Sequence, residues 1–164
     1  MVYAEDRMAR KVLITVLLIS FGIAVEGCPK QPTDEELLKS ATLHHQSDEF
    51  DEALSDFQLL IEKYPKSDKV PEALYAMGVI CQNKKKEYRK AESLYTKLVM
   101  DFPNDPTSQV AAYQRARIFF GHLHMPDSAE AAYELFLKRY PDALSAPSAR
   151  TELDSLKATM KSKK

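Results

Sequence analysis

The feature that most constrains this chain is an internal repeat. The motifs "KYP", "DFP" and "RYP" end at Pro65, Pro103 and Pro141. The distance along the chain from one of these prolines to the next is the same both times, and we call it the repeat interval. The wider pattern, A-x3-[FY]-x6-[YF]-P, is carried by Ala53, Phe57, Tyr64 and Pro65, by Ala91, Tyr95, Phe102 and Pro103, and by Ala129, Tyr133, Tyr140 and Pro141. Self-similarity at such a spacing indicates stacked copies of one supersecondary unit.

Each repeat contains two segments with the period of a helix. In residues 50–64 the apolar side chains recur at intervals of three and four, which places them on one helical stripe. The alanine of the pattern lets a second helix approach closely, the aromatic residue fills the gap one turn later, and the proline ends the helix. Preceding helices are expected at 34–46, 71–82 and 108–121. Thr33 with Glu36 predicts a capping box, and Pro71 suits a first turn.

This pattern resembles tetratricopeptide repeats, which are helix–turn–helix units of about 34 residues. The resemblance covers residues 34–141, and residues 145–160 resemble the terminal capping helix. It implies an all-α fold: a right-handed α-solenoid of three helix pairs plus a capping helix, within a domain of residues 34–156. The helix pairs are expected at about 34–66, 70–104 and 107–142, and the small position of their first helices is taken by Ala41, Gly78 and Ala116. Arg115 departs from the family, because an apolar residue is usual there.

The N-terminal segment is expected to direct export. Residues 12–25, "VLITVLLISFGIAV", form a continuous apolar run preceded by Arg10 and Lys11. The run is short for a span of about 30 Å of hydrocarbon, and its layout is that of a signal peptide, expected over residues 1–27. A buried helix is the alternative, but no polar residue interrupts the run with a helical period.

Cys28 follows this run in the sequence "VEGC", which resembles the lipobox of bacterial lipoproteins. Val25 and Gly27 suit that pattern, whereas Glu26 departs from it. The resemblance implies that Cys28 is joined to diacylglycerol, that an acyl chain such as palmitate is added to its freed amine, and that residues 28–33 form a short tether. Several acyl chains together anchor a protein firmly where a single chain does not. Because Pro29 rather than Asp follows the cysteine, the resemblance also implies the periplasmic face of the outer membrane.

The sequence leaves two alternatives to lipidation of Cys28. The first is a free thiol. The second is a disulfide with Cys81, although Cys81 is expected to be a buried, inert thiol in a helix. If Glu26 blocks lipidation, the protein is instead a soluble periplasmic adaptor.

The repeats are similar to two groups of envelope proteins: the TolA-binding, cell-division-coordinating family and the repeat lipoprotein of the outer-membrane barrel assembly machine.

Composition and motifs exclude several functions. The formal net charge of −1 gives no field that would gather nucleic acid. Basic residues cluster only in residues 157–164, which are expected to be a frayed tail. Only Gly78 and Gly121 lie beyond residue 27, so no phosphate-cradling loop is possible. We therefore expect no cofactor and no small-molecule substrate.

No catalytic or metal-binding constellation is expected either. His44 and His45 are adjacent, so on a helix they point about 100° apart and do not chelate together. His122 and His124 fall in a turn with no carboxylate or thiol cluster beside them. Serine, histidine and aspartate are all present, but no nucleophile elbow is found. The sequence predicts a protein that is not an enzyme.

The resemblance finally implies a binding surface, because the first helices of such repeats line a concave groove. With Gly78 and Ala116 at the small position, the groove side is expected to carry Tyr75, Val79, Gln82, Tyr113, Arg117 and Phe120. Tyrosine and arginine dominate interface energetics, and Arg117 is expected to pair with a carboxylate or the backbone of an incoming segment. Alternatively, Tyr75, Tyr113 and Phe120 fill space between units. The implied partner is an envelope protein or peptide segment, in barrel assembly, Tol–Pal function, or secretion and pilus biogenesis.

Overall fold

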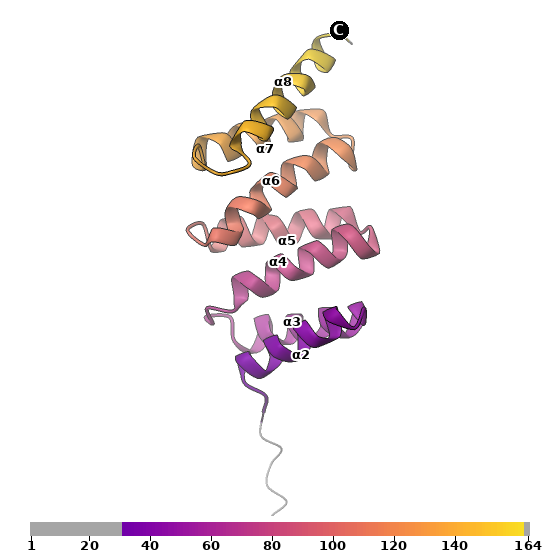
Figure 1. Ribbon diagram of the computed structural model, residues 1–164, viewed down its shortest axis with the longest axis vertical. Coiled ribbons are helices and arrows are strands. Elements are labelled where there is room, and N and C mark those ends of the chain that lie inside the picture. Colours follow the sequence, from indigo (N-terminus) through magenta and orange to yellow (C-terminus); the bar gives the residue numbers. More distant parts are fainter. Residues whose placement is uncertain (1–30, 163–164) are drawn as a thin grey trace, which may run out of the picture. The chain divides into compact units, whose positions relative to one another are not determined.

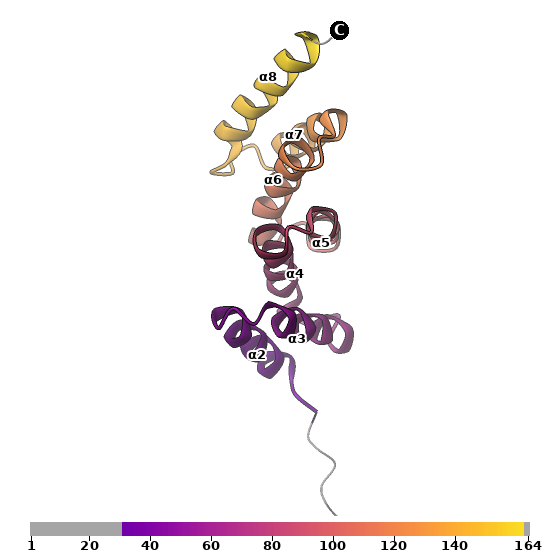
Figure 2. The same cartoon turned by 90° about the vertical axis from the view of Figure 1, so that its right-hand side faces the viewer.

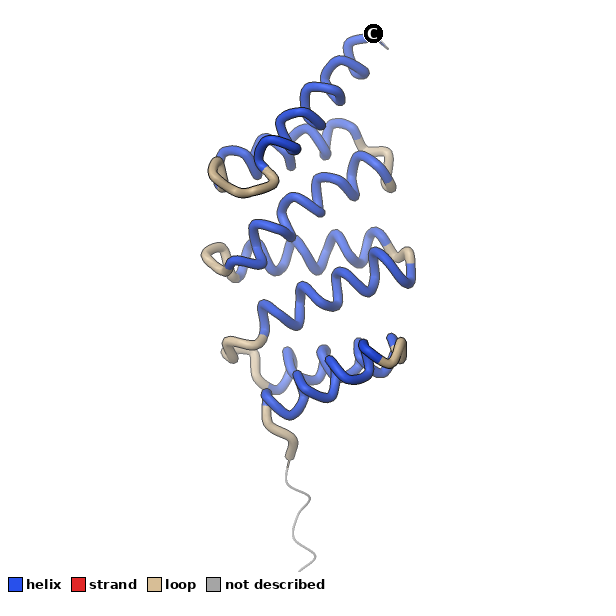
Figure 3. Tube along the Cα trace, in the orientation of Figure 1, coloured by secondary structure: helices blue, strands red, loops and turns tan. Residues whose placement is uncertain are grey.

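The computed structural model describes residues 31–162, and both the expected signal peptide and Cys28 lie outside these residues. Every regular element of the described part is helical (Figure 3). The elements are α2 (Asp34–Gln46), α3 (Phe50–Lys63), α4 (Val70–Ile80), the π-helical turn η1 (Cys81–Lys85), α5 (Tyr88–Asp101), α6 (Pro106–Gly121), α7 (Pro126–Arg139) and α8 (Ala146–Ser162). None of these helices has the length and apolar character needed to cross a membrane.

The helices stack as three pairs followed by α8, in the order of the chain (Figure 1). Each helix packs against the next one, and α4 also packs against α6. Seen from the side, α2, α4 and α6 form one layer, and α3, α5 and α7 form the other (Figure 2). This arrangement confirms the predicted all-α solenoid.

The helix starts follow from local sequence signals. The predicted capping box is present: the Thr33 hydroxyl accepts from the Glu36 N–H at 3.2 Å, and the Glu36 carboxylate accepts from the Thr33 N–H at 2.8 Å. Pro71 lies in the first turn of α4 as expected. Asp105 caps α6 by accepting from the Thr107 N–H at 2.8 Å.

The repeat interval is visible in the backbone itself. The second helices are followed by the C-cap residues Tyr64, Phe102 and Tyr140, each with φ of −127° and ψ between 56° and 58°. The turn inside each pair contains one residue in the left-handed region: Asp48, Lys86 and His124, with φ of 60°, 59° and 52°. Left-handed φ values are uncommon for residues with a Cβ. Since three different residue types adopt this conformation in equivalent turns, the helix pairing imposes it.

The second and third pairs hold one more residue in this turn than the first. The Glu49 N–H donates to the His44 carbonyl, five residues back, whereas the Glu87 N–H donates to the Cys81 carbonyl, six residues back. In the third pair the Met125 N–H donates to the Phe119 carbonyl, also six residues back. In the second pair the extra residue is absorbed by η1, in keeping with the role of π-turns as one-residue insertions.

The small residues of the pattern lie where helices approach most closely. Ala53, Ala91 and Ala129 are all fully buried, as the pattern predicts. A Cβ placed on Gly78 would lie 2.4 Å from the ring of Tyr95, which is itself fully buried. Gly78 is therefore required by the ring of Tyr95 rather than by any turn.

The last helix, α8, packs in the register of a first helix. Its buried residues Ala146, Ala149, Leu153 and Leu156 each lie one repeat interval after a position of α6. The helix continues to Ser162, so residues 157–162 belong to it rather than to the frayed tail that the sequence led us to expect. Lys157 is held there by Glu134 and Glu130, with Nζ–Oε1 distances of 2.6 and 3.4 Å.

Candidate partner-binding surface

The six residues predicted to bind a partner come from α4, from the π-helical turn η1 that follows it, and from α6. Tyr75 and Val79 lie on α4, Gln82 on η1, and Tyr113, Arg117 and Phe120 on α6. Tyr75, Val79, Gln82 and Tyr113 are half-buried, whereas Arg117 and Phe120 are exposed. The Tyr75 ring lies beside that of Tyr95, with 6.1 Å between centroids. The surface is thus partly accessible and partly built into the packing between units.

Gln82 is held by contacts within the chain. The Tyr95 hydroxyl donates to Gln82 Oε1 at 3.0 Å, and Gln82 Nε2 donates to Gln114 Oε1 at 3.4 Å. Burial raises the pKa of Tyr95, so the phenol stays protonated and remains a donor. These bonds orient Gln82 and connect α5 to α6.

Tyr113 and Arg117 converge on one carboxylate, that of Glu152 on α8. The Tyr113 hydroxyl donates to Glu152 Oε1 at 3.0 Å, and the buried Tyr133 hydroxyl donates to Oε2 at 2.7 Å. Arg117 Nε lies 3.7 Å from Oε1. Burial, followed by the bond to Glu152, raises the pKa of both tyrosines. The carboxylate that we expected an incoming segment to bring to Arg117 is supplied by the chain itself.

Glu152 belongs to the candidate surface but was not predicted from the sequence, although the repeat register contained a signal. One and two repeat intervals before it lie Gln114 and Ala76. On the preceding second helices, the pattern places Tyr133 next to Glu152, Tyr95 next to Gln114 and Phe57 next to Ala76. At this one repeat position the residue is therefore polar only where the preceding second helix carries a tyrosine hydroxyl.

Phe120 differs from the other five residues because it borders a cavity. A pocket of about 220 Å³ is lined by Phe120, His124, Pro126, Leu156, Thr159 and Met160. These residues come from the end of α6, the following turn, the start of α7 and the second half of α8. Phe120 is 39% exposed, so the pocket can be reached from solvent.

Comparison with known proteins agrees with this geometry. Residues 37–67 and 110–143 match the family model of the tetratricopeptide repeat. These two stretches carry tetratricopeptide repeats. The matched stretches cover most of α2–α3 and α6–α7, and the α4–α5 pair between them repeats the same backbone angles. Proteins built from such repeats present extended surfaces to protein partners.

Among solved structures, the chain is similar to a tetratricopeptide repeat protein from Parabacteroides merdae. The similarity covers 77% of this chain and 60% of that protein, at 16% sequence identity and a TM-score of 0.36. The chain thus spans less than two thirds of the length of that protein. No match to a curated protein was found.

Arg115, which departs from the tetratricopeptide pattern, is accommodated by a local ion pair. Its Nε donates to Glu92 Oε1 at 2.9 Å, and each side chain is about a quarter exposed. The guanidinium also lies over the Phe119 ring, 5.3 Å from its centroid. Arg115 therefore joins α6 to α5 where an apolar residue is usual.

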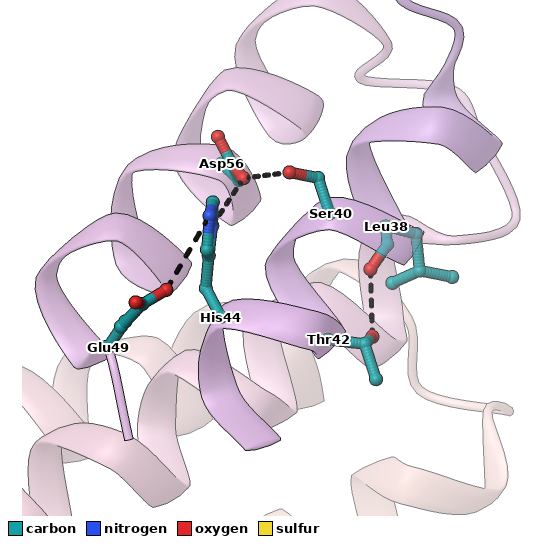
Figure 4. A network of polar contacts seen from close by, with 6 residues as sticks. All are labelled: Leu38, Ser40, Thr42, His44, Glu49 and Asp56. Carbon is teal, nitrogen blue, oxygen red and sulfur yellow. Dashed lines mark hydrogen bonds and ion pairs between the residues drawn. The ribbon is translucent and has the colours of Figure 1, made fainter. Parts of the chain in front are cut away.

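A serine, a histidine and an aspartate do meet in the first tetratricopeptide repeat (Figure 4). The Ser40 hydroxyl donates to Asp56 Oδ2 at 2.6 Å, and His44 Nδ1 lies 3.0 Å from the same oxygen. His44 Nε2 faces Glu49 at 3.8 Å. Serine and histidine both contact the aspartate, whereas a catalytic triad needs the histidine between the other two. The network joins α2 to α3.

The remaining cysteine and histidine side chains considered as candidates lie in surroundings that favour a structural role. Cys81 is buried, and burial raises the pKa of its thiol, which disfavours the reactive thiolate. The His122 ring stacks on Tyr88, with 3.9 Å between centroids. Within residues 31–162, no three histidine, cysteine or acidic side chains are grouped closely enough to hold a metal ion.

Proposed function

We propose that this chain is a non-enzymatic scaffold that binds a protein or peptide segment on the first-helix layer and is tethered through Cys28 to the periplasmic face of the outer membrane. The observation that carries the binding role is the set of tetratricopeptide repeats, whose α4 and α6 offer accessible aromatic and basic side chains. An envelope assembly machine, of the barrel-assembly, Tol–Pal or secretion and pilus type, is the proposed setting.

The packing around these side chains supports a binding role. Gln82 is oriented by Tyr95, and Tyr113 and Arg117 are oriented by Glu152. Side chains that are already fixed lose little conformational freedom when a partner binds, and this strengthens binding. The surface is therefore preorganised.

The tether limits where the partner can be. Residues 29–33, "PKQPT", are all that separate Cys28 from α2, and fully extended they span roughly 17 Å. A repeat domain anchored at Cys28 would stay close to the membrane surface. Its partner is then an outer-membrane component or a periplasmic protein that reaches this surface.

The anchor is tested by changing Cys28→Ser and fractionating cells. We expect the variant to leave the outer-membrane fraction or to remain unprocessed, and mass spectrometry to find acyl chains on wild-type Cys28. Unchanged membrane association together with an unacylated wild type would refute the anchor.

The binding surface is tested with a photo-crosslinking residue placed at Tyr75 in cells. A matched control carries the same residue at Gln58, which is exposed on α3 in the other layer. We expect a discrete partner crosslink from position 75 and none from position 58. Equal labelling from both positions would contradict a groove on the first-helix layer. Truncating Tyr113 and Arg117 is a weaker test, because it also removes contacts that dock α8.

A second candidate is a soluble periplasmic adaptor of the TolA-binding type. The observation that favours it is Glu26, which departs from the lipobox pattern directly before Gly27 and Cys28. A wild-type protein that is cleaved, unacylated and released with the periplasm would establish this candidate in place of the lipoprotein.

A further inference from the structure

A side-chain contact recurs at the junctions between successive helix pairs. At the first junction the Lys84 ammonium lies over the ring of Phe50, 4.8 Å from its centroid. At the second junction the ring of His122 stacks on Tyr88 at 3.9 Å, with 5° between the ring planes. Both contacting residues of the second junction lie one repeat interval after those of the first, so the two junctions contain equivalent contacts. The aromatic residue opens the second helix, and the other residue comes from the next unit.

The third junction has the backbone for this contact but not the side chains. The same interval leads from Tyr88 to Pro126 and from His122 to Met160. Pro126 carries no aromatic ring, and Pro126 and Met160 both line the pocket of about 220 Å³ described above. Leu156 and Phe120 complete its apolar wall. The pocket therefore lies at the repeat position where an aromatic ring contacts the following unit at the other junctions.

A basic group stands beside this position. At the first junction Lys85 forms an ion pair with Asp51, the residue directly after Phe50. Two repeat intervals further along, Lys161 occupies the place of Lys85. Asp127 occupies the place of Asp51, but no ion pair joins Lys161 to it or to another acidic side chain among residues 31–162. The neighbouring Lys157, by contrast, is paired with two glutamates. The junction thus offers an apolar pocket and an adjacent cation that lacks an ion-pair partner within that range.

We propose that this pocket binds an aromatic side chain from a partner protein, and that Lys161 pairs with an acidic residue next to that side chain. The occupant would repeat what Phe50 and Asp51 do at the first junction. A second copy of this chain is disfavoured as the source, because Phe50 and Tyr88 are half-buried and already occupied in their own junctions. The inference rests on the proposed scaffold role and specifies the chemistry of its partner.

The first test uses a probe copied from the chain itself. A labelled peptide with the sequence of residues 48–55, "DEFDEALS", is titrated with the purified full chain, alongside the same peptide with alanine in place of phenylalanine. We expect the phenylalanine peptide to bind at least tenfold more tightly. Lys161→Glu should weaken its binding about tenfold, and Lys138→Glu, an exposed control on α7, should leave it unchanged. Equal affinities of the two peptides, or no binding of either, would overturn the proposal.

The second test fills the pocket from within. Pro126→Tyr restores the aromatic residue found at the equivalent positions, so we expect it to abolish peptide binding while the melting temperature stays the same or rises. Pro126→Ala keeps the pocket open and should still bind. Undiminished binding by Pro126→Tyr would refute the site. Wild-type self-association in sedimentation experiments that Pro126→Tyr removes would overturn the proposal in favour of a second copy. Crosslinking from Tyr75 is independent of these results, so the scaffold role and this pocket can fail separately.

Discussion

The first and last junctions of the repeat domain share a backbone geometry but are held by different chemistry. In the first, the repeat positions at the centre hold Phe57 and Ala76, and the edge is closed by Phe50 and Lys84. In the last, the centre is a hydrogen-bonded cluster around Glu152, and the edge is left as a pocket beside Pro126. The helices meet at equivalent backbone positions in both junctions, whereas the side chains in contact there differ together from one junction to the other.

The need to satisfy buried hydroxyl groups explains why these contacting side chains differ together. A buried hydroxyl without a hydrogen-bond partner is costly, so a tyrosine at the central position requires an acceptor on a neighbouring element. Tyr95 finds Gln82, which is bonded to Gln114, and Tyr133 finds Glu152 directly. Phe57 carries no hydroxyl, and the equivalent first-helix residue is alanine.

The largest expected effect breaks the last junction. Glu152→Ala leaves the buried Tyr133 hydroxyl without its acceptor and removes a bond from Tyr113, so we expect the free energy of unfolding to fall by about 3 kcal/mol. Chemical denaturation measures this. Asp154→Ala, an exposed change on the same helix, should stay within about 0.5 kcal/mol of wild type. Combining Glu152→Ala with Tyr133→Phe should cost less than the sum of the single changes. Strict additivity would mean that the two side chains do not interact.

The next effect concerns Gly78, which lets the two helices of the middle pair approach closely. Gly78→Ala places a Cβ against the buried Tyr95 ring, so we expect a loss of about 1–3 kcal/mol in unfolding free energy. Gly121→Ala is the matched control, because no atom beyond its chain neighbours and its own helix backbone lies within 4 Å of the added Cβ. That control should be neutral or stabilising. Equal effects of the two substitutions would show that the ring can move aside.

A pH dependence sharpens the contrast between Tyr133 and Phe57. The folded pKa of Tyr133 is raised above its unfolded value of about 10, so its contribution is complete below pH 10 and is lost as the pH rises further. Each such tyrosine lowers stability by up to about 1.4 kcal/mol per pH unit above that point. Tyr133→Phe should remove this part of the slope in denaturation measured between pH 9 and pH 11. An unchanged slope would contradict the burial of the hydroxyl.

The smallest expected effect lies at the edge of the first junction. Lys84→Ala removes the ammonium from the Phe50 ring, where a cation at an exposed site contributes about 0.5–1 kcal/mol. Lys86→Ala, an exposed neighbour in the same turn, controls for the loss of charge. Thermal denaturation at low ionic strength should separate the two variants. A larger loss for Lys86→Ala would indicate that the edge contact is not stabilising.

The sequence predicted those parts of the fold that are set by local patterns. The helix period, the capping box at Thr33 and the prolines that end or begin helices all act within a few residues, and the structure contains them. The cluster at Glu152 was missed because it joins residues on three helices, and no local pattern links Tyr113 to a side chain on α8. For the same reason, Arg117 was matched with an external carboxylate. In the sequence, the π-turn at Cys81–Lys85 could be recognised only as one extra residue between the helices of the second pair.

The recurring end of each second helix, with nearly identical angles at Tyr64, Phe102 and Tyr140, has a consequence for how such a chain can be lengthened or shortened. The backbone accepts a duplicated or deleted copy at any of these points without a new turn geometry. The side chains are more restrictive. Tyr95 finds its acceptor, Gln82, within its own helix pair, whereas the Tyr133 hydroxyl donates to Glu152, which lies beyond Tyr140 in the following helix. A copy that ends at Tyr140 would separate Tyr133 from its acceptor, so a viable exchange at that point carries the segment from Tyr133 through Glu152 as one block.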